Sequence, residues 1–272
     1  MSAAAPPPGT VTAFVLAGQR GPDDPVARHS GQRWKALAPV AGRPMVERVL
    51  DALLAARSIG RIAVAAPTPS LLSGLDGLRP ALESGRIVML PTEAGPSGSV
   101  AAGWAQLGHP CPTLVTTADH ALLTPELIDA FCARSLAQES DIDAALVPAS
   151  AIRAAFPESR RTFLRFREES YSGANLFALK RAAAAAAIAF WQSVEQDRKR
   201  PWRIARRVGP GTLLAYLLRR LTLEQAMGRL SRVAGAQARA VILPEAWAAV
   251  DVDKPEDLAL AEHILASRNA EA

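Results

Sequence analysis

Cysteine and aromatic residues are scarce in this sequence. Its two cysteines, Cys111 and Cys132, are too few for a disulfide framework or a cysteine-based zinc site. We therefore expect both thiols to pack in the interior of a protein from a reducing, cytoplasmic compartment. Aromatic residues make up 5% of the chain and no nucleic-acid recognition motif is present, so nucleic acid is not an expected partner.

Long apolar runs are also missing. No stretch reaches the roughly 18 uncharged apolar residues of a membrane-spanning helix, and the alanine-rich run 182–190 is too short and too weakly hydrophobic. Residues 1–10, MSAAAPPPGT, lack the apolar centre of a signal peptide, so we expect a flexible lead-in. Because 49% of the 272 residues are hydrophobic, we expect one globular domain over 11–265 and a short tail over 266–272.

Positive charge is concentrated in one segment. Eleven arginines or lysines and a single acid, Glu224, lie between Arg198 and Arg239, whereas the whole chain has a formal net charge of only +5. The rest of the chain is therefore net acidic. Clustered basic residues suggest an anionic partner more strongly than an evenly basic surface does.

Apolar runs typical of strands alternate along the chain with stretches typical of helices. Thr124 and Pro125 form a favourable helix start, and Pro44 opens another helical stretch. This alternation predicts an α/β fold with a mostly parallel sheet, in which ligands bind beyond the carboxyl ends of the strands. The expected strands are 11–17, 61–66, 86–90, 113–118, 143–149 and 239–243, and the expected helices are 44–56, 70–78, 97–107 and 125–136.

A glycine-containing turn follows the first expected strand, in the segment 15-VLAGQRG-21. Glycines let a backbone approach an anion closely, and successive N–H groups can cradle a phosphate. Arg20, Arg33 and Lys35 add cationic side chains to this region. The segment matches neither G-x-x-x-x-G-K-[ST] nor G-x-G-x-x-G, so a P-loop ATPase and a dinucleotide-binding domain both lose support.

Acidic residues follow two further strands. Asp119 ends the strand-like run of 116-TTADHALLTPELI-128, and Asp251 and Asp253 precede a proline-started helix in 249-AVDVDKPEDLALAEHIL-265. Taken alone, Asp119 is more readily explained as a turn or capping residue. Together with a phosphate-binding turn, these acids predict a Mg²⁺ site, because Mg²⁺ prefers a few carboxylates plus phosphate oxygens and waters.

These segments together resemble the MobA-like (molybdopterin-guanylyltransferase-like) nucleotidyltransferases. Four ordered motifs of that family have counterparts here, and their order makes the resemblance specific for nucleotide chemistry. The family motifs L-A-G-G-x-G, K-x-L-x-P-V-x-G-[KR]-P-M, D-x-P-L-[LIV]-T-P-E-L and [DN]-x-[DN]-T-P-E-D-L resemble 16-LAGQRG-21, 35-KALAPVAGRPM-45, 119-DHALLTPEL-127 and 251-DVDKPEDL-258, and 172-SGAN-175 is similar to its [ST]-G-[GA]-N segment.

The resemblance, over about residues 11–180 and 239–265, implies the fold and reaction of that family. The implied fold is a three-layer α/β/α sandwich with a mostly parallel Rossmann-like sheet, of the glycosyltransferase-A type that sugar-phosphate and isoprenoid-alcohol cytidylyltransferases share. A basic helical insertion is expected at about 190–235. The implied reaction is the Mg²⁺-dependent transfer of a nucleoside monophosphate, from CTP or GTP, to a phosphorylated acceptor with release of pyrophosphate.

The resemblance also implies site residues where this sequence matches the family motifs. Asp119 and Asp253 are the implied Mg²⁺ ligands, and Asp251 either supports Asp253 or exchanges roles with it. Lys35 and Arg20 are implied to hold the triphosphate and its transition state, which makes them catalytic together with Asp119. The implied nucleotide-binding residues are Leu16, Ala17, Gly18, Gln19, Gly21, Thr92, Gly95, Ser97, Gly98, Ser99 and Ala118.

Three features depart from the family pattern. Gln19 replaces the second glycine of L-A-G-G, Ala121 replaces the proline of D-x-P-L, and residues 22–34 form an unusual insert. Gln19 either narrows the nucleotide site or takes over a backbone contact. Since Lys35, both metal acids and residues 42-GRP-44 remain, the pattern argues against an inactive relative.

The acceptor side of the site is expected within 160-RRTFLRFREESYSGAN-175. In an alternating strand Arg161, Arg165 and Arg167 share a face and could hold a phosphate, although a solvated edge strand explains them equally well. Asn175 is expected to bind acceptor hydroxyls, because Gly173 permits close approach.

The basic segment also carries leucines at helical spacing, in two expected helices around 209-GPG-211. They pack against the core, form a small helical cap, or contact a membrane. The neighbouring arginines suit an anionic membrane or a lipid-linked phosphate, so peripheral contact at the inner membrane face through residues 198–239 stays open. The leucines are Leu213, Leu214, Leu217, Leu218 and Leu221.

The sequence as a whole predicts a nucleotidyltransferase whose partners are a nucleoside triphosphate and a phosphorylated acceptor. One alternative is a nucleotide-sugar-dependent glycosyltransferase on the same fold. It is disfavoured because 116-TTADHA-121 carries a single acid where D-x-D is needed, and 251-DVD-253 lies too late in the chain. The other alternative is a catalytically idle nucleotide-binding or membrane-associated protein that Gln19 has disabled.

Overall fold

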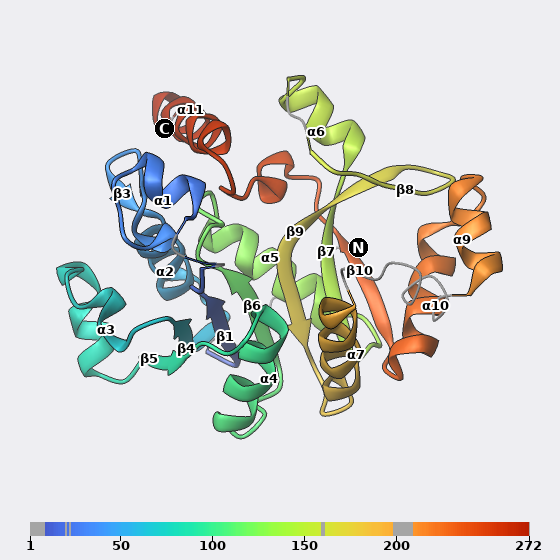
Figure 1. Cartoon of the computed structure of the whole chain (residues 1–272), viewed down its shortest axis with the longest axis horizontal. Coiled ribbons are helices and arrows are strands. Elements are labelled where there is room, and N and C mark those ends of the chain that lie inside the picture. The colour runs from blue at the N-terminus through green and yellow to red at the C-terminus, as the bar shows by residue number, and fades with distance from the viewer. Residues whose placement is uncertain (1–8, 20, 22, 159–160, 198–208, 272) are drawn as a thin grey trace.

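A computed structural model describes residues 9–19, 21, 23–158, 161–197 and 209–271. Helices cover both faces of a central sheet, as Figure 1 shows. The predicted α/β/α arrangement with a mostly parallel sheet is therefore confirmed. Within the described ranges, no helix is both long and apolar enough to cross a bilayer.

The main sheet contains all six expected strands and two more. The strands are β1 (Val11–Leu16), β4 (Ile59–Ala66), β5 (Ile87–Pro91), β6 (Thr113–Thr117), β7 (Ile142–Pro148), β8 (Leu164–Arg165), β9 (Ser170–Leu179) and β10 (Ala238–Ile242), and β2 (Pro39–Val40) and β3 (Arg43–Pro44) form a separate hairpin. Their order is β10-β7-β9-β6-β1-β4-β5, with β8 paired to β9. β9 runs antiparallel to β6 and β7, whereas the other neighbours along this order are parallel.

The helices begin and end close to the expected positions, with one exception. The Oγ1 atom of Thr124 accepts a hydrogen bond from Leu127 N at 3.3 Å, which confirms the expected N-cap. The single helix expected over 70–78 is wrong: two short 3₁₀ turns occupy this stretch, and Gly74, a poor helix former, lies between them. The α-helices are α1 (Pro25–His29), α2 (Met45–Ala55), α3 (Arg79–Glu83), α4 (Pro96–Gln106), α5 (Pro125–Leu136), α6 (Ala149–Ala155), α7 (Ala184–Gln196), α9 (Pro210–Leu217), α10 (Leu223–Ala234) and α11 (Pro255–Glu271), and the 3₁₀ helices are η1 (Lys35–Leu37), η2 (Pro69–Leu72), η3 (Asp76–Leu78) and η4 (Ala246–Ala249).

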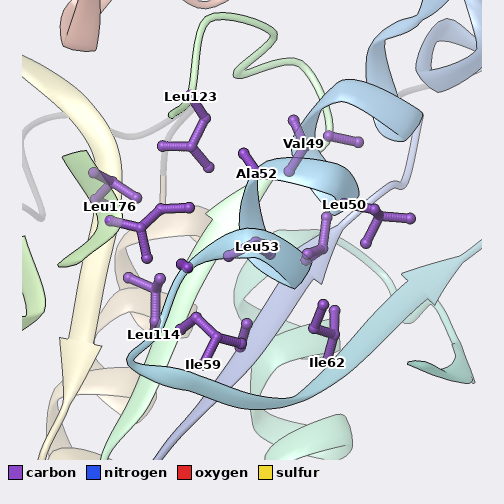
Figure 2. Close-up of a cluster of buried hydrophobic side chains, with 14 of the residues drawn as sticks. Val49, Leu50, Ala52, Leu53, Ile59, Ile62, Leu114, Leu123 and Leu176 are labelled. Carbon is purple, nitrogen blue, oxygen red and sulfur yellow. The ribbon is translucent and has the colours of Figure 1, made fainter. Parts of the chain in front are cut away.

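The core consists of apolar clusters on the two faces of the sheet. Figure 2 shows Leu50 and Leu53 of α2 over Ile62 of β4, in the cluster that α5 also joins. On the opposite face, Phe14 of β1 packs with α4 and α7. Gly103 permits this approach, because a Cβ atom there would lie 2.4 Å from the Phe14 ring. Because the side chains of β1 alternate between the two faces of the sheet, this one strand packs against the helices on both faces.

Most leucines of the basic segment are exposed, in contrast to the expectation that they pack against the core. Leu221 is buried, with 3% of its surface exposed, but Leu213, Leu214, Leu217 and Leu218 are 40%, 58%, 67% and 55% exposed. Packing against the core is therefore wrong for these four residues. The first of the two helices expected around 209–211 falls in 198–208, outside the described residues.

Candidate active site

The turn after β1 lies at the carboxyl edge of the sheet. Ala118 N donates to Leu16 O at 2.9 Å, so the ends of β1 and β6 lie side by side. A Cβ atom on Gly18 would lie 3.4 Å from the Thr92 side chain, which places the loop after β5 against this turn. The structure thus brings together the predicted nucleotide-binding segments around Leu16, Thr92 and Ala118. Arg20 lies outside the described residues.

Gln19 connects the turn to the lysine segment. Its Oε1 atom accepts a hydrogen bond from Lys35 N at 2.6 Å, and its Nε2 atom donates to Gly21 O at 2.5 Å. Gly21 has a φ of 152°, in a region that favours glycine. Of the two roles considered for Gln19, the structure therefore supports a contact to the backbone: the amide fixes where Lys35 begins η1.

Lys35 lies between two carboxylates from distant parts of the chain. Its Nζ atom is 2.6 Å from Asp119 Oδ2 and 2.6 Å from Asp253 Oδ1. Burial lowers the pKa of Lys35, but attraction to Asp119 and hydrogen bonds to both acids outweigh burial, so the pKa is raised. The ammonium group is therefore charged at neutral pH and holds the two acids together.

Hydrogen bonds with neighbouring side chains and backbone groups hold the two acids in place. Thr117 Oγ1 donates to Asp119 Oδ1 at 2.5 Å, and Val252 N donates to Asp119 O at 3.1 Å. Asp257, in the first turn of α11, accepts hydrogen bonds from the backbone N of Asp253 at 3.2 Å and of Lys254 at 3.0 Å. The end of β6 and the start of α11 are thus joined directly beside the carboxylates.

Asp251 faces different partners from Asp253. Arg161 forms an ion pair with the Asp251 carboxylate and also donates to Asp251 O at 3.1 Å, while Asn175 Nδ2 donates to Asp251 Oδ2 at 3.1 Å. Because Arg161 already balances the charge of Asp251, the geometry favours Asp253 as the partner of Asp119. Asp251 instead joins the metal-acid segment to the predicted acceptor residues.

Asn175 lies at an irregularity of β9. Its φ is 48°, in the left-handed region that non-glycine residues rarely adopt, and the pairing of β9 with β7 shifts between Ala144 and Leu146. Such strained positions are frequent at functional sites, and a bulge redirects a side chain. The bulge follows Gly173 and places the Asn175 amide on Asp251, beside the predicted metal acids.

The predicted alternating strand of arginines is not what the structure has. β8 covers only Leu164–Arg165, and Arg165 is exposed, with its backbone N donating to the Tyr216 hydroxyl at 3.2 Å. Buried Phe166 breaks the alternation, because it packs with Tyr171 in a separate apolar cluster. Arg161 therefore lies beside Asp251, whereas Arg165 lies next to α9.

The turn at the start of α4 contacts a residue that the sequence did not suggest. Glu195 of α7 accepts hydrogen bonds from the backbone N and the Oγ of Ser97, the former at 3.2 Å. Gly95 has a φ of 96°, and a Cβ there would lie 2.1 Å from the Glu195 carboxylate. Ser99 Oγ donates to Gly95 O at 3.1 Å. The Ser97 and Ser99 hydroxyls thus shape this turn, and only tertiary contact reveals Glu195.

His120 adjoins Asp119 but is neutral at pH 7. Burial lowers its pKa to about 4, and attraction to Asp119 and Asp251 offsets only part of that effect. The ring is 1% exposed. A buried neutral imidazole fits a structural role better than contact with a phosphate.

Among the described residues, neither the cavity between α10 and β10 nor a cluster of metal ligands marks the candidate site. This open cavity, of about 670 Å³, has none of the predicted site residues in its lining. Within the described part of the chain, no three His, Cys, Asp or Glu side chains come close enough together to hold a metal by themselves. A divalent cation at this site would therefore need ligands from a substrate in addition to the carboxylates.

Comparison with known proteins identifies a family. Residues 13–208 match the family described as the MobA-like NTP transferase domain. No curated protein matches the chain. A solved structure described as a hypothetical transferase from Thermus thermophilus is 35% identical, with a TM-score of 0.74, and the match covers 91% of this chain and 98% of that one.

Two more distant structures share the fold. One is 4-diphosphocytidyl-2C-methyl-D-erythritol synthase from Anaerococcus prevotii, 12% identical with a TM-score of 0.58 over 95% of this chain and 99% of that one. The other is a CMP:2-keto-3-deoxy-manno-octonic acid synthetase in complex with CTP, 13% identical with a TM-score of 0.54 over 96% and 99% of the two chains. Both are nucleotidyltransferases with this arrangement of sheet and helices.

Proposed function

Since the chain belongs to the MobA-like NTP transferase domain family and is a nucleotidyltransferase, we propose that it transfers a nucleoside monophosphate from CTP or GTP to a phosphorylated small molecule or lipid headgroup. The proposed metal is Mg²⁺. The observation that carries the proposal is the Lys35 ammonium, 2.6 Å from both Asp119 and Asp253. One cation and two anions from three segments converge where a nucleotide bound to the turn after β1 would place its phosphates.

The donor set supports Mg²⁺. Mg²⁺ commonly binds one or two protein carboxylates and completes its coordination with phosphate oxygens and waters. Asp119 and Asp253 already hold one cation, the Lys35 ammonium, between them. Asp253 is 58% exposed and so accessible to an arriving ion, whereas Asp119 is 19% exposed. These two side chains would hold the metal, and Asp251 would stay with Arg161.

The proposed reaction is an in-line displacement. A phosphate oxygen of the acceptor forms a bond to the α-phosphorus, the bond from that phosphorus to the α–β bridging oxygen breaks, and pyrophosphate leaves with the electron pair. Such a step depends on positioning and charge neutralisation more than on covalent catalysis. Lys35 would offer its ammonium to the triphosphate, and bound Mg²⁺ would supply further neutralisation of phosphate charge.

We assign the nucleotide and the acceptor to different groups of residues. The turn after β1 lies against Thr92, in the loop that leads to α4, and these segments would bind the nucleotide through backbone groups, as the family resemblance implies. Arg161 and Asn175 both contact Asp251 and would bind the acceptor. The idle-protein alternative loses support because Gln19 positions Lys35.

Thermal unfolding with each of the four common ribonucleoside triphosphates, with and without Mg²⁺, tests the proposal. A ligand at about 100 times its Kd stabilises by about 2.7 kcal/mol, which raises the midpoint of a chain this size by a few degrees. We expect a shift for CTP or GTP that depends on Mg²⁺ and is lost in Asp119→Asn. Asp76→Asn, a change at a carboxylate that is 82% exposed, is the matched control and should retain the shift.

The same nucleotide should then support pyrophosphate release in a screen of phosphorylated acceptors. A shift that persists in Asp119→Asn would contradict the metal assignment. If no triphosphate stabilises the protein, the transferase proposal for this site is wrong.

A further inference from the structure

Helix α9 packs through Ala215 and Tyr216 and turns its leucines outward. Ala215 and Tyr216 join the apolar cluster of Phe166 and Leu221, and the Tyr216 ring lies 6.0 Å from the Phe166 ring. The leucines around them point away from that cluster and are 40–67% exposed. A surface helix normally buries its leucines, so among the residues that the structure describes this orientation leaves an apolar face uncovered. The exposed leucines are Leu213, Leu214, Leu217 and Leu218.

Strand β8 and its neighbours extend this apolar face and place four arginines next to it, with Glu168 the exposed acid closest to them in the chain. Leu164, 45% exposed, lies on β8 next to α9, since Arg165 N donates to the Tyr216 hydroxyl. The backbone of Arg167 likewise bonds to Leu221 O at 2.9 Å. No ion pair within the described ranges involves the four exposed arginines here. They are Arg165, Arg167, Arg219 and Arg220, and with Leu164 and the α9 leucines they form what we term the α9 patch.

We propose that the α9 patch docks the protein onto an anionic lipid membrane. Leucines that insert at the acyl boundary and arginines that face anionic headgroups are the two components of reversible interfacial binding. A second copy of the chain fits less well, because a two-fold contact would place this patch on itself and oppose arginine with arginine. The patch therefore matches a surface that is apolar inside and negative at its boundary.

The chain itself connects the patch to the candidate active site. Arg161, which is bonded to Asp251, precedes Leu164 by three residues, a reach of at most about 10 Å. Docking through Leu164 and α9 would hold the Arg161 side of the site near the bilayer. Membrane docking and nucleotidyl transfer are nevertheless separate claims, since either can fail without the other.

Vesicle flotation with the full chain tests the proposal. We expect the protein to float with vesicles of phosphatidylcholine containing about 30% phosphatidylglycerol at low salt, and not with pure phosphatidylcholine. Binding should weaken at least about tenfold on raising the salt from about 0.05 to 0.5 M, because arginine–headgroup attraction is screened. Absence of binding to the anionic vesicles at low salt would overturn the proposal.

Matched variants distinguish binding through the α9 patch from nonspecific adsorption to vesicles. The double substitution Leu214→Glu with Leu217→Glu should reduce partitioning at least about tenfold, since it removes apolar contact and adds like charge. Leu136→Glu, at a leucine of α5 that is 39% exposed, should bind like the unsubstituted protein. Arg219→Gln with Arg220→Gln should reduce both binding and its dependence on salt.

Equal loss in the Leu136→Glu control would refute the assignment to α9. Light scattering of the free protein provides an independent check. A dimer that the α9 double variant dissociates would identify a second copy as the occupant and would contradict membrane docking. Thermal unfolding of each variant without vesicles confirms that the fold is retained.

Discussion

At the residue scale, the positive charge of Lys35 lies between Asp119 and Asp253, the two acids proposed to bind the metal. Its side chain is 11% exposed, and attraction to the acids keeps its pKa above the ordinary value despite burial. A raised pKa means that the stability contributed by this pairing is present at neutral pH and is lost only as pH rises through the folded-state pKa. Near neutral pH, the ammonium therefore competes with any divalent cation for Asp119 and Asp253.

Replacing Lys35 by methionine should have opposite effects on metal binding and on turnover. Without nucleotide, we expect Lys35→Met to bind Mn²⁺ about tenfold or more tightly than the unsubstituted protein, because a like charge beside the carboxylates is removed. Turnover should fall by about 10²-fold or more, because a cation at the triphosphate is lost. Lys254→Met, at the exposed neighbour of Asp253, is the control, with changes below about twofold in Mn²⁺ titrations. Unchanged or weaker Mn²⁺ binding in Lys35→Met would contradict the competition.

Restoring glycine at position 19 should impair the protein. Gln19 bonds both Lys35 N and Gly21 O, so Gln19→Gly loses two hydrogen bonds and gains backbone freedom. We expect a loss of about 1–2 kcal/mol in denaturant unfolding and no gain in pyrophosphate release. Gln19→Glu keeps the acceptor oxygen for Lys35 N and should retain more stability than glycine does. Higher activity in Gln19→Gly would instead identify Gln19 as a disabling substitution.

At the scale of elements, α4 and α7 meet at the turn that the family resemblance assigns to the nucleotide. The Glu195 carboxylate lies at the N-terminus of α4, where exposed N–H groups and the helix dipole favour negative charge. Gly95 accommodates it, since any side chain there would overlap the carboxylate. The end of α7 therefore helps to determine the shape of this turn.

Removing the Glu195 carboxylate should loosen this junction. Glu195→Ala leaves the Ser97 N–H and hydroxyl without their partner, and we expect a loss of about 1–3 kcal/mol in unfolding free energy. Glu224→Ala, at an exposed acid in the first turn of α10, should cost less than about 0.5 kcal/mol. Urea unfolding measures both, and equal losses would show that Glu195 has no special role.

At the scale of the whole molecule, sheet order decides which loops meet. β1 lies between β4 and β6, so the loops after β1 and β6 adjoin at one edge, and Asp253 reaches the same place through the segment before α11. β9 enters antiparallel between β6 and β7 and brings Asn175 to Asp251. The site is thus assembled from segments that are far apart in the chain.

The reactivity of the two thiols tests how α5 packs on the sheet. Cys132 is buried and its pKa is raised to about 12 by burial, whereas Cys111 is exposed. At mildly alkaline pH, an aromatic disulfide reagent should titrate one thiol in the native protein and two after unfolding, because the thiolate is the reactive form. Cys111→Ser should abolish the native signal and leave one thiol in the unfolded chain. Rapid labelling of Cys132 in the native protein would contradict the burial of α5 on the sheet.

The sequence by itself determined the local elements and the chemistry of the candidate site. The apolar run 11–17 and the Thr124 cap depend on short-range pattern and residue type, so they could be predicted, and the family motifs singled out Lys35, Asp119 and Asp253. The expectation that Cys111 packs in the interior was wrong, because local composition does not determine which loop is covered.

Tertiary structure decided the rest. Contacts between segments distant in sequence determine several features of the structure. They are the antiparallel pairing of β9, the different partners of Asp251 and Asp253, the Glu195 contact and the outward leucines of α9. Such contacts depend on strand order and on which surfaces the core has already filled. No periodicity within one segment encodes them.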